Sequence, residues 1–147
     1  RLGQLQKTII VLVSVLAMSK IMTYSGMIDS LSLGFSQYLG SLYPLFAPLL
    51  GTIGVLVTGS VASSGILMGS LQAEMGRALD ISPAWLVAMN ASGSTAGKML
   101  APHSVAIVMA ALGSSDEESN ITGIIFKFLL GYVGILMVIS LLGYLII

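Results

Sequence analysis

Apolar residues dominate long stretches of this chain, and the charged residues fall into short segments between them. Four stretches of at least 17 residues contain no Asp, Glu, Lys or Arg, namely residues 30–73, 81–97, 99–115 and 128–147. A helix needs about 20 apolar residues to cross about 30 Å of hydrocarbon, so the last stretch alone is long enough to span a bilayer. The apolar positions do not alternate as they do in a membrane β-strand. The pattern therefore predicts an all-α, polytopic helical membrane bundle.

The small and charged residues between these stretches divide the chain into predicted elements. We expect spans at about 8–27, 42–57 and 121–147, a half-helix at 66–79 and a broken helix at 83–112. Ser82 and Pro83 suit the N-cap and first turn of that broken helix. The mixed stretch from Asp29 to Ser41 fits either a short interfacial helix or a tilted span. All 147 residues are expected to form one transmembrane portion, the C-terminal part of a larger protein.

The composition supports a membrane protein and excludes several functions. Charged residues make up 8% of the chain and hydrophobic residues 56%, whereas an ordinary soluble domain is about 25% charged. With a mean hydropathy of +1.00 and no net charge, the chain offers no basic patch for nucleic acid. It has no cysteine and one histidine, so neither a disulfide nor a thiolate or histidine-rich metal site is expected. We expect no metal and no cofactor.

Two clusters of small and hydroxyl residues interrupt the apolar sequence. They read TGSVASSG at 58–65 and NASGSTAG at 90–97. Backbone that leaves a helix at membrane depth survives only inside protein or beside a wet cavity, and paired interruptions typify transporter sites in which half-helix N-termini face an anion. The alternative is that Gly65/Gly69 and Gly93/Gly97 are packing surfaces between helices. Because both clusters are rich in hydroxyls, we favour the binding site.

Two titratable residues follow the second cluster. Lys98 is the deepest candidate cation, and a lysine at membrane depth must pair or face water, so it is a candidate site residue. Its alternative role is a side chain that extends to the membrane interface. His103 is the single side chain that titrates near neutral pH, although a lone histidine is more often a hydrogen-bonded packing residue.

Several segments resemble one known family. The strings MTYSGM at 22–27, PLFAPLLG at 44–51, TGSVASSGILMGSLQ at 58–72 and NASGSTAGKMLAPHSVAI at 90–107 are similar to the C-terminal part of bacterial L-lactate permeases. The resemblance implies a multi-pass secondary transporter of the bacterial inner membrane that takes up lactate, and often glycolate, together with protons. It also implies further N-terminal spans. Val61, Gly65 and His103 depart from the family pattern, in which polar residues and a glutamine are common at these positions.

These observations together define a predicted binding site. Lys98 and half-helix N-termini near Ser60 and Ser92 are expected to hold the carboxylate of a small monocarboxylate. Further polar side chains are expected to hydrogen-bond the carboxylate or the 2-hydroxyl group, namely Ser63, Ser64, Asn90, Ser94 and Thr95. His103 is a candidate for proton coupling.

Other functions remain open on the sequence alone. The same architecture would serve a transporter of another organic or inorganic anion, although a doubly charged substrate calls for more than one deep cation. A membrane subunit that does not itself transport is a further alternative. An intramembrane enzyme is not expected, because the chain has no HExxH or GxSxG motif and no pair of aspartates within an apolar stretch.

Overall fold

The computed structural model describes residues 2–112 and 118–146, and within these ranges it contains helices and no strand. The all-α prediction is therefore confirmed. The elements are α1 (Leu2–Tyr24), α2 (Met27–Leu39), the 3-10 turn η1 (Gly40–Leu42), α3 (Tyr43–Thr58), α4 (Val61–Ala78), α5 (Pro83–Gly97), α6 (Pro102–Leu112) and α7 (Glu118–Ile146). Two segments are long and apolar enough to cross a membrane, Met27–Thr58 and Ile121–Ile146, with mean hydropathies of 1.6 and 2.3.

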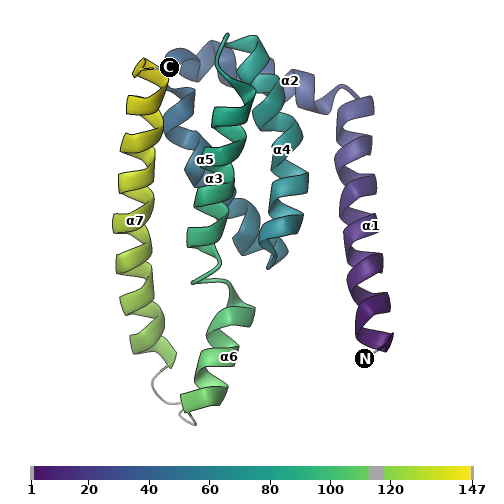
Figure 1. The fold of residues 1–147 in the computed structure, drawn as a ribbon, viewed down its shortest axis with the longest axis vertical. Helices are drawn as coiled ribbons and strands as arrows, with labels where there is room; N and C mark the ends of the chain where they lie inside the picture. Colours follow the sequence, from purple (N-terminus) through teal and green to yellow (C-terminus); the bar gives the residue numbers. More distant parts are fainter. Residues whose placement is uncertain (1, 113–117, 147) are drawn as a thin grey trace.

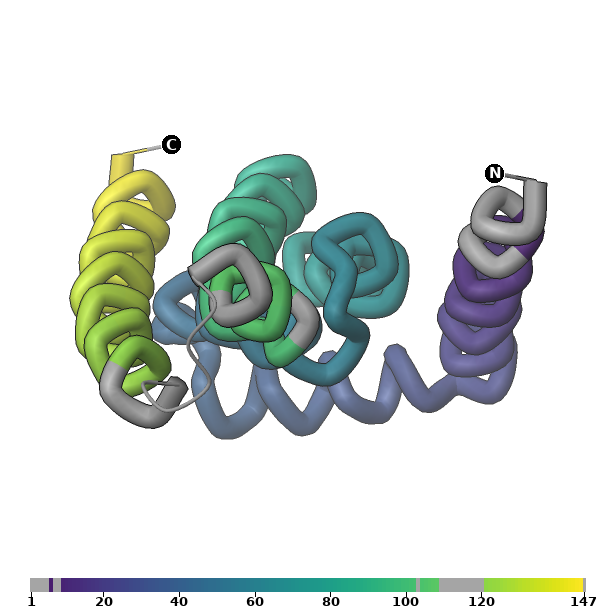
Figure 2. The backbone as a smooth tube through the Cα atoms, turned by 90° about the horizontal axis from the view of Figure 1, so that it is seen from below, coloured from purple at the N-terminus to yellow at the C-terminus, as the bar shows by residue number. Residues whose placement is uncertain are grey.

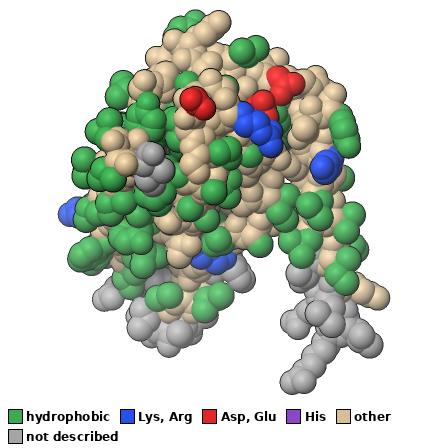
Figure 3. Space-filling model, turned by 45° about the horizontal axis from the view of Figure 1, so that its top comes forward, with side chains coloured by type: hydrophobic (Ala, Val, Ile, Leu, Met, Phe, Trp, Pro, Cys, Tyr) green, Lys and Arg blue, Asp and Glu red, His purple; other side chains and the backbone are tan. Residues whose placement is uncertain are grey.

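Most of the helices run along the long axis of the molecule. Figure 1 shows α1 at one side, α7 at the other, and α3, α4 and α5 between them. The helix α2 crosses one end of this row and carries the chain from α1 to α3, as Figure 2 shows from below. It corresponds to the mixed stretch from Asp29 to Ser41. Hydrophobic side chains cover much of the face in Figure 3, with few charged groups among them, which suits a lipid environment.

Glycines bring the backbones of α3 and α5 into direct contact. A Cβ atom at Gly51 would overlap the carbonyl of Asn90, and one at Gly93 would overlap the carbonyl of Pro48. At Gly97 it would lie 2.8 Å from the carbonyl oxygen of Thr52. Gly93 and Gly97 therefore pack against another helix. A Cβ atom at Gly65 or Gly69 would meet nothing within 4 Å, so only one of the two glycine pairs forms such a contact.

The first interruption is shorter than the sequence predicted. The chain leaves the helical path only at Gly59, with a φ of 68°, and at Ser60, which is extended. The helix α4 begins at Val61, so the prediction of non-helical backbone through residue 65 was wrong. The physical reason is that Ser60 is an N-cap, since its hydroxyl accepts a hydrogen bond from the Ser63 N–H at 3.3 Å.

The second interruption lies elsewhere than predicted. Residues 90–97 are helical within α5, and the chain leaves the helix after Gly97, before α6 begins at Pro102. The hydroxyls of Ser92 and Thr95 donate to the carbonyls of Ala88 and Ala91, both at 3.0 Å, so these residues bond within their own helix. Pro102 disfavours helical backbone at the residue before it and suits the first turn of a new helix.

Candidate functional site

The predicted site residues differ widely in burial. Four of them are almost completely buried, namely Ser63, Ser64, Asn90 and Ser94. Ser60, Ser92 and Lys98 are half-buried, whereas Thr95 is exposed. His103 belongs to α6, but its side chain lies outside the described part of the chain, so its candidate role in proton coupling stays a prediction. The four buried residues of the predicted site thus come from α4 and α5.

Lys98 joins the two interruptions of the chain. It is the C-cap residue of α5, and its Nζ donates a hydrogen bond of 2.6 Å to the carbonyl of Gly59, the C-cap residue of α3. The ammonium group therefore lies at the negative end of the α3 dipole. Ser60 follows Gly59 and caps the N-terminus of α4, so a positive side chain and a helix N-terminus lie at the same turn. Such a junction favours an anion.

The second predicted helix N-terminus does not exist. Ser92 lies inside α5, and its amide is part of a continuous helix, so the prediction of a carboxylate at a half-helix N-terminus near Ser92 was wrong. The sequence misled because a cluster of small and hydroxyl residues looks the same in a packed helix and in a broken one. The N-terminus at Ser60 is present.

Ser64 and Ser94 form a closed group at the centre of the three helices. Their Oγ atoms lie 3.0 Å apart, and each lies within hydrogen-bond distance of the Gly51 carbonyl, at 3.2 and 3.0 Å. Both side chains are fully buried. Because these hydroxyls pair with each other and with the backbone of α3, this arrangement is that of polar contacts that hold helices together.

A second polar group contains two residues that the sequence did not indicate. Tyr43 on α3 donates a hydrogen bond of 3.1 Å to Oε1 of Gln72 on α4, and Nε2 of Gln72 donates at 3.4 Å to Oδ1 of Asn90 on α5. All three side chains are buried. The signal available for Gln72 was its position as an amide within the apolar stretch 30–73. Tyr43 resembled an ordinary packing residue.

Two buried polar atoms among the described residues have no hydrogen-bond partner. They are Oγ of Ser63 and Nδ2 of Asn90. A buried donor without a partner costs about 1–3 kcal/mol. Ser63 is the third residue of α4, close to the Lys98 junction along the chain, whereas Asn90 belongs to the group with Gln72. Each orphan atom therefore marks a different place where a polar ligand would be stabilised.

The geometry divides the predicted residues into two groups. Asn90 and Lys98 are eight positions apart along α5, which places them about 12 Å apart along the helix axis. The two residues are therefore about two helical turns apart. Lys98, Ser60 and Ser63 lie near the turns that end α5 and begin α4, whereas Asn90 lies in the middle of α5, one turn before Ser94.

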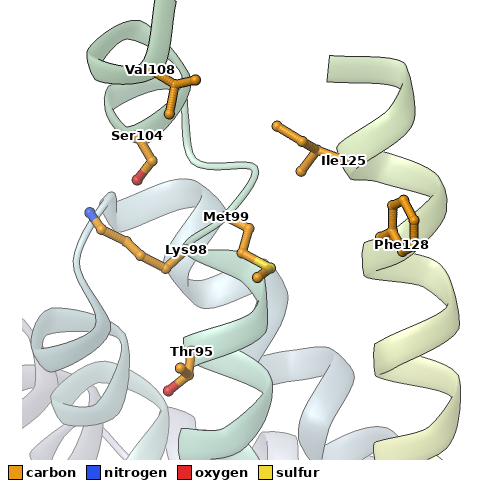
Figure 4. A pocket seen from close by; sticks show the side chains of 7 residues that line it. All are labelled: Thr95, Lys98, Met99, Ser104, Val108, Ile125 and Phe128. Atoms are coloured by element: carbon orange, nitrogen blue, oxygen red, sulfur yellow. The ribbon is translucent and has the colours of Figure 1, made fainter. Parts of the chain in front are cut away.

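An open cavity of about 520 Å³ adjoins Lys98 between α5, α6 and α7. Its lining is mostly apolar and comprises Thr95, Lys98, Met99, Ser104, Val108, Ile125 and Phe128. Figure 4 shows the Lys98 side chain extending away from α7, whose Ile125 and Phe128 close the opposite side. Within the described ranges, no three His, Cys, Asp or Glu side chains gather as a metal site. The ammonium group of Lys98 beside this mostly apolar cavity suits binding of a small anion with an apolar part.

Comparison with known proteins decides the family. The family model for L-lactate permease matches residues 1–147. The chain belongs to the L-lactate permease family. It is 39% identical over 128 residues to glycolate permease GlcA of Escherichia coli (strain K12), which is 87% of this chain and 23% of that protein. It is 41% identical over 107 residues to the L-lactate permease of Salmonella typhi, 73% of this chain and 19% of that protein.

The L-lactate permease family places the chain among membrane transporters and not among enzymes. The L-lactate permease of Bacillus subtilis (strain 168) is 37% identical over 119 residues, 80% of this chain and 21% of that protein. The chain thus spans about a fifth of the length of the curated permeases that it matches. No solved structure matches the chain.

Proposed function

We propose that this chain is part of a secondary active transporter that takes up L-lactate and related 2-hydroxy monocarboxylates such as glycolate, coupled to protons. The names of its relatives, L-lactate permease and glycolate permease, support this substrate class. The transporter would be a multi-pass protein of the bacterial inner membrane, completed by further spans outside this chain, because the relatives are several times longer than this chain. Its partners would be the acid, the proton and the lipid bilayer.

The observation that carries the proposal is the junction at Lys98. An ammonium group has three N–H donors, and one of them is used by the Gly59 carbonyl. The others are available to a carboxylate, together with the N–H groups of Val61 and Ala62, the first two of α4, since the Ser63 N–H already donates to Ser60. The hydroxyls of Ser60 and Ser63 lie in the first turn of the same helix. A singly charged acid matches the one Lys or Arg side chain that is half-buried among those whose burial the structure describes.

The adjoining cavity explains why the substrate would be a small acid with an apolar part. Its apolar side chains are Met99, Val108, Ile125 and Phe128, and its polar groups belong to Thr95, Lys98 and Ser104. A carboxylate held at Lys98 would place its methyl or methylene carbon toward Met99 and Phe128. Thr95 and Ser104 offer hydroxyl groups for a 2-hydroxyl. A dicarboxylate would place its second charge in this apolar region at a large desolvation cost.

Transport by the full-length permease in proteoliposomes tests the function. With an inward proton gradient, we expect uptake of labelled L-lactate that an excess of unlabelled glycolate inhibits and that a protonophore abolishes. Empty liposomes are the control. Uptake of succinate or sulfate in preference to L-lactate would instead favour a transporter of another anion. Absence of any uptake by folded protein would contradict the proposal.

A further inference from the structure

Three buried side chains from three helices form one hydrogen-bonded chain. It runs from the hydroxyl of Tyr43 to Gln72 and from Gln72 to Asn90, with distances of 3.1 and 3.4 Å. Tyr43 and Gln72 are completely buried, and Asn90 is 1% exposed. This series of three hydrogen-bonded side chains differs from the Ser64 and Ser94 group, because its last member, Asn90, retains an atom without a partner, Nδ2.

The direction of these hydrogen bonds fixes the orientation of both amides. The phenol O–H of Tyr43 donates to Oε1 of Gln72, which places Nε2 of Gln72 on the other side, toward Asn90. Nε2 carries only donors, and Asn90 must therefore turn its Oδ1 toward Gln72. The two N–H donors of Asn90 then point away from Gln72, where no described side chain or carbonyl accepts them.

The Nδ2 donor of Asn90 has no acceptor among the residues that the structure describes. The free energy cost of this unpaired donor is removed when an oxygen atom accepts the hydrogen bond. In a permease for 2-hydroxy acids, the transported molecule supplies carboxylate and hydroxyl oxygens. The distance of about 12 Å along α5 from Lys98 makes this a second position for the acid.

We infer that Gln72 is a positioning residue, and that it holds Asn90 so that the Asn90 amide donates to an oxygen of the transported acid at a position separate from Lys98. Tyr43 supports this role by fixing the orientation of Gln72. The inference rests on the proposed transport of a small acid, and it assigns a role to two residues, Gln72 and Tyr43, that do not themselves touch the acid.

Uptake kinetics of variants of the full-length permease test the inference. Gln72→Leu is expected to raise KM for L-lactate about tenfold, since the loss of an oriented donor is worth about 1.4 kcal/mol, with a smaller effect on the maximal rate. Tyr43→Phe keeps the ring and removes only the hydroxyl, so it is expected to raise KM two- to fivefold. The matched controls are Gln37→Leu and Tyr38→Phe, whose side chains are exposed on α2 and whose KM should stay unchanged.

A double-mutant cycle separates positioning from a purely structural role. If Gln72 and Tyr43 act through Asn90, neither substitution raises KM further in an Asn90→Ala background. Additive increases in KM would overturn the inference, and so would an unchanged KM in the folded single variants. Should Gln72→Leu fail to fold, the Tyr43→Phe and Asn90→Ala cycle decides alone. Wild-type protein that takes up no L-lactate would overturn the proposed function and this inference with it, whereas wild-type uptake with additive changes overturns the inference alone.

Discussion

The hydroxyl of Ser140 on α7 donates a hydrogen bond to the carbonyl of Pro44 on α3. That carbonyl has no partner within its own helix, because the residue four positions later is Pro48, which has no N–H. Ser140 is completely buried, and its own carbonyl accepts a hydrogen bond of 3.1 Å from Nε1 of Trp85. The last helix is therefore attached at the point where a proline leaves α3 unsatisfied.

Ser140→Ala should destabilise the protein by about 1–3 kcal/mol, because it leaves a buried carbonyl without a donor. The measurement is the free energy of unfolding of purified protein in detergent, with denaturant as the variable. Ser14→Ala, at an exposed position on α1, is the matched control and should change the stability by less than about 0.5 kcal/mol. Equal stability of the two variants would show that the Ser140 contact contributes nothing.

The two glycine pairs should respond differently to alanine. Gly93→Ala places a methyl group against the Pro48 carbonyl and should prevent α3 and α5 from packing, with loss of folded protein. Gly65→Ala meets nothing within 4 Å and should preserve or slightly raise stability, since alanine favours helix by about 1 kcal/mol over glycine. The yield of monodisperse protein by size-exclusion chromatography measures both. Intact, well-folded Gly93→Ala would contradict the close contact.

The sequence predicted the all-α class because long uncharged stretches have few other solutions in a membrane. It placed one helix at 42–57, and α3 runs from Tyr43 to Thr58. It failed at 90–97 because a hydroxyl in an apolar helix can bond to a carbonyl four residues earlier, as Thr95 does to Ala91, without breaking the helix. Composition alone does not distinguish that case from a true interruption.

The candidate site was predictable only in part. Lys98 and Ser60 could be found from the sequence, because a charge and an N-cap residue beside apolar helices carry a local signal. The hydrogen-bonded side chains of Tyr43, Gln72 and Asn90 could not be found from the sequence, because their hydrogen bonds join residues 29 and 18 positions apart. Such contacts depend on which helices are neighbours, and the hydrophobic pattern does not specify this.

His103→Gln should retain proton-coupled uptake. Glutamine keeps a hydrogen-bond donor and acceptor, but it does not titrate between pH 5 and 8. If His103 is a hydrogen-bonding residue, cells that express the full-length variant will still alkalinise a weakly buffered medium when L-lactate is added, as a pH electrode records. The control is the same measurement with cells that carry the empty vector. A variant that exchanges lactate without moving protons would show instead that His103 carries the proton.

Lys98→Met should weaken uptake far more than Lys127→Met. Lys98 is half-buried and donates to the Gly59 carbonyl beside the N-terminus of α4, whereas Lys127 is exposed on α7. A hydrogen bond to a charged group contributes about 1.5–3 kcal/mol, so the apparent affinity for L-lactate should fall about ten- to a hundredfold. Uptake rates of the full-length variants against L-lactate concentration give this value. Because methionine also removes the contact with Gly59, unfolding of both variants is measured in parallel, and the affinity change must exceed what lost folded protein explains. Equal and small effects of the two substitutions would mean that Lys98 only extends to the membrane interface and does not hold the carboxylate.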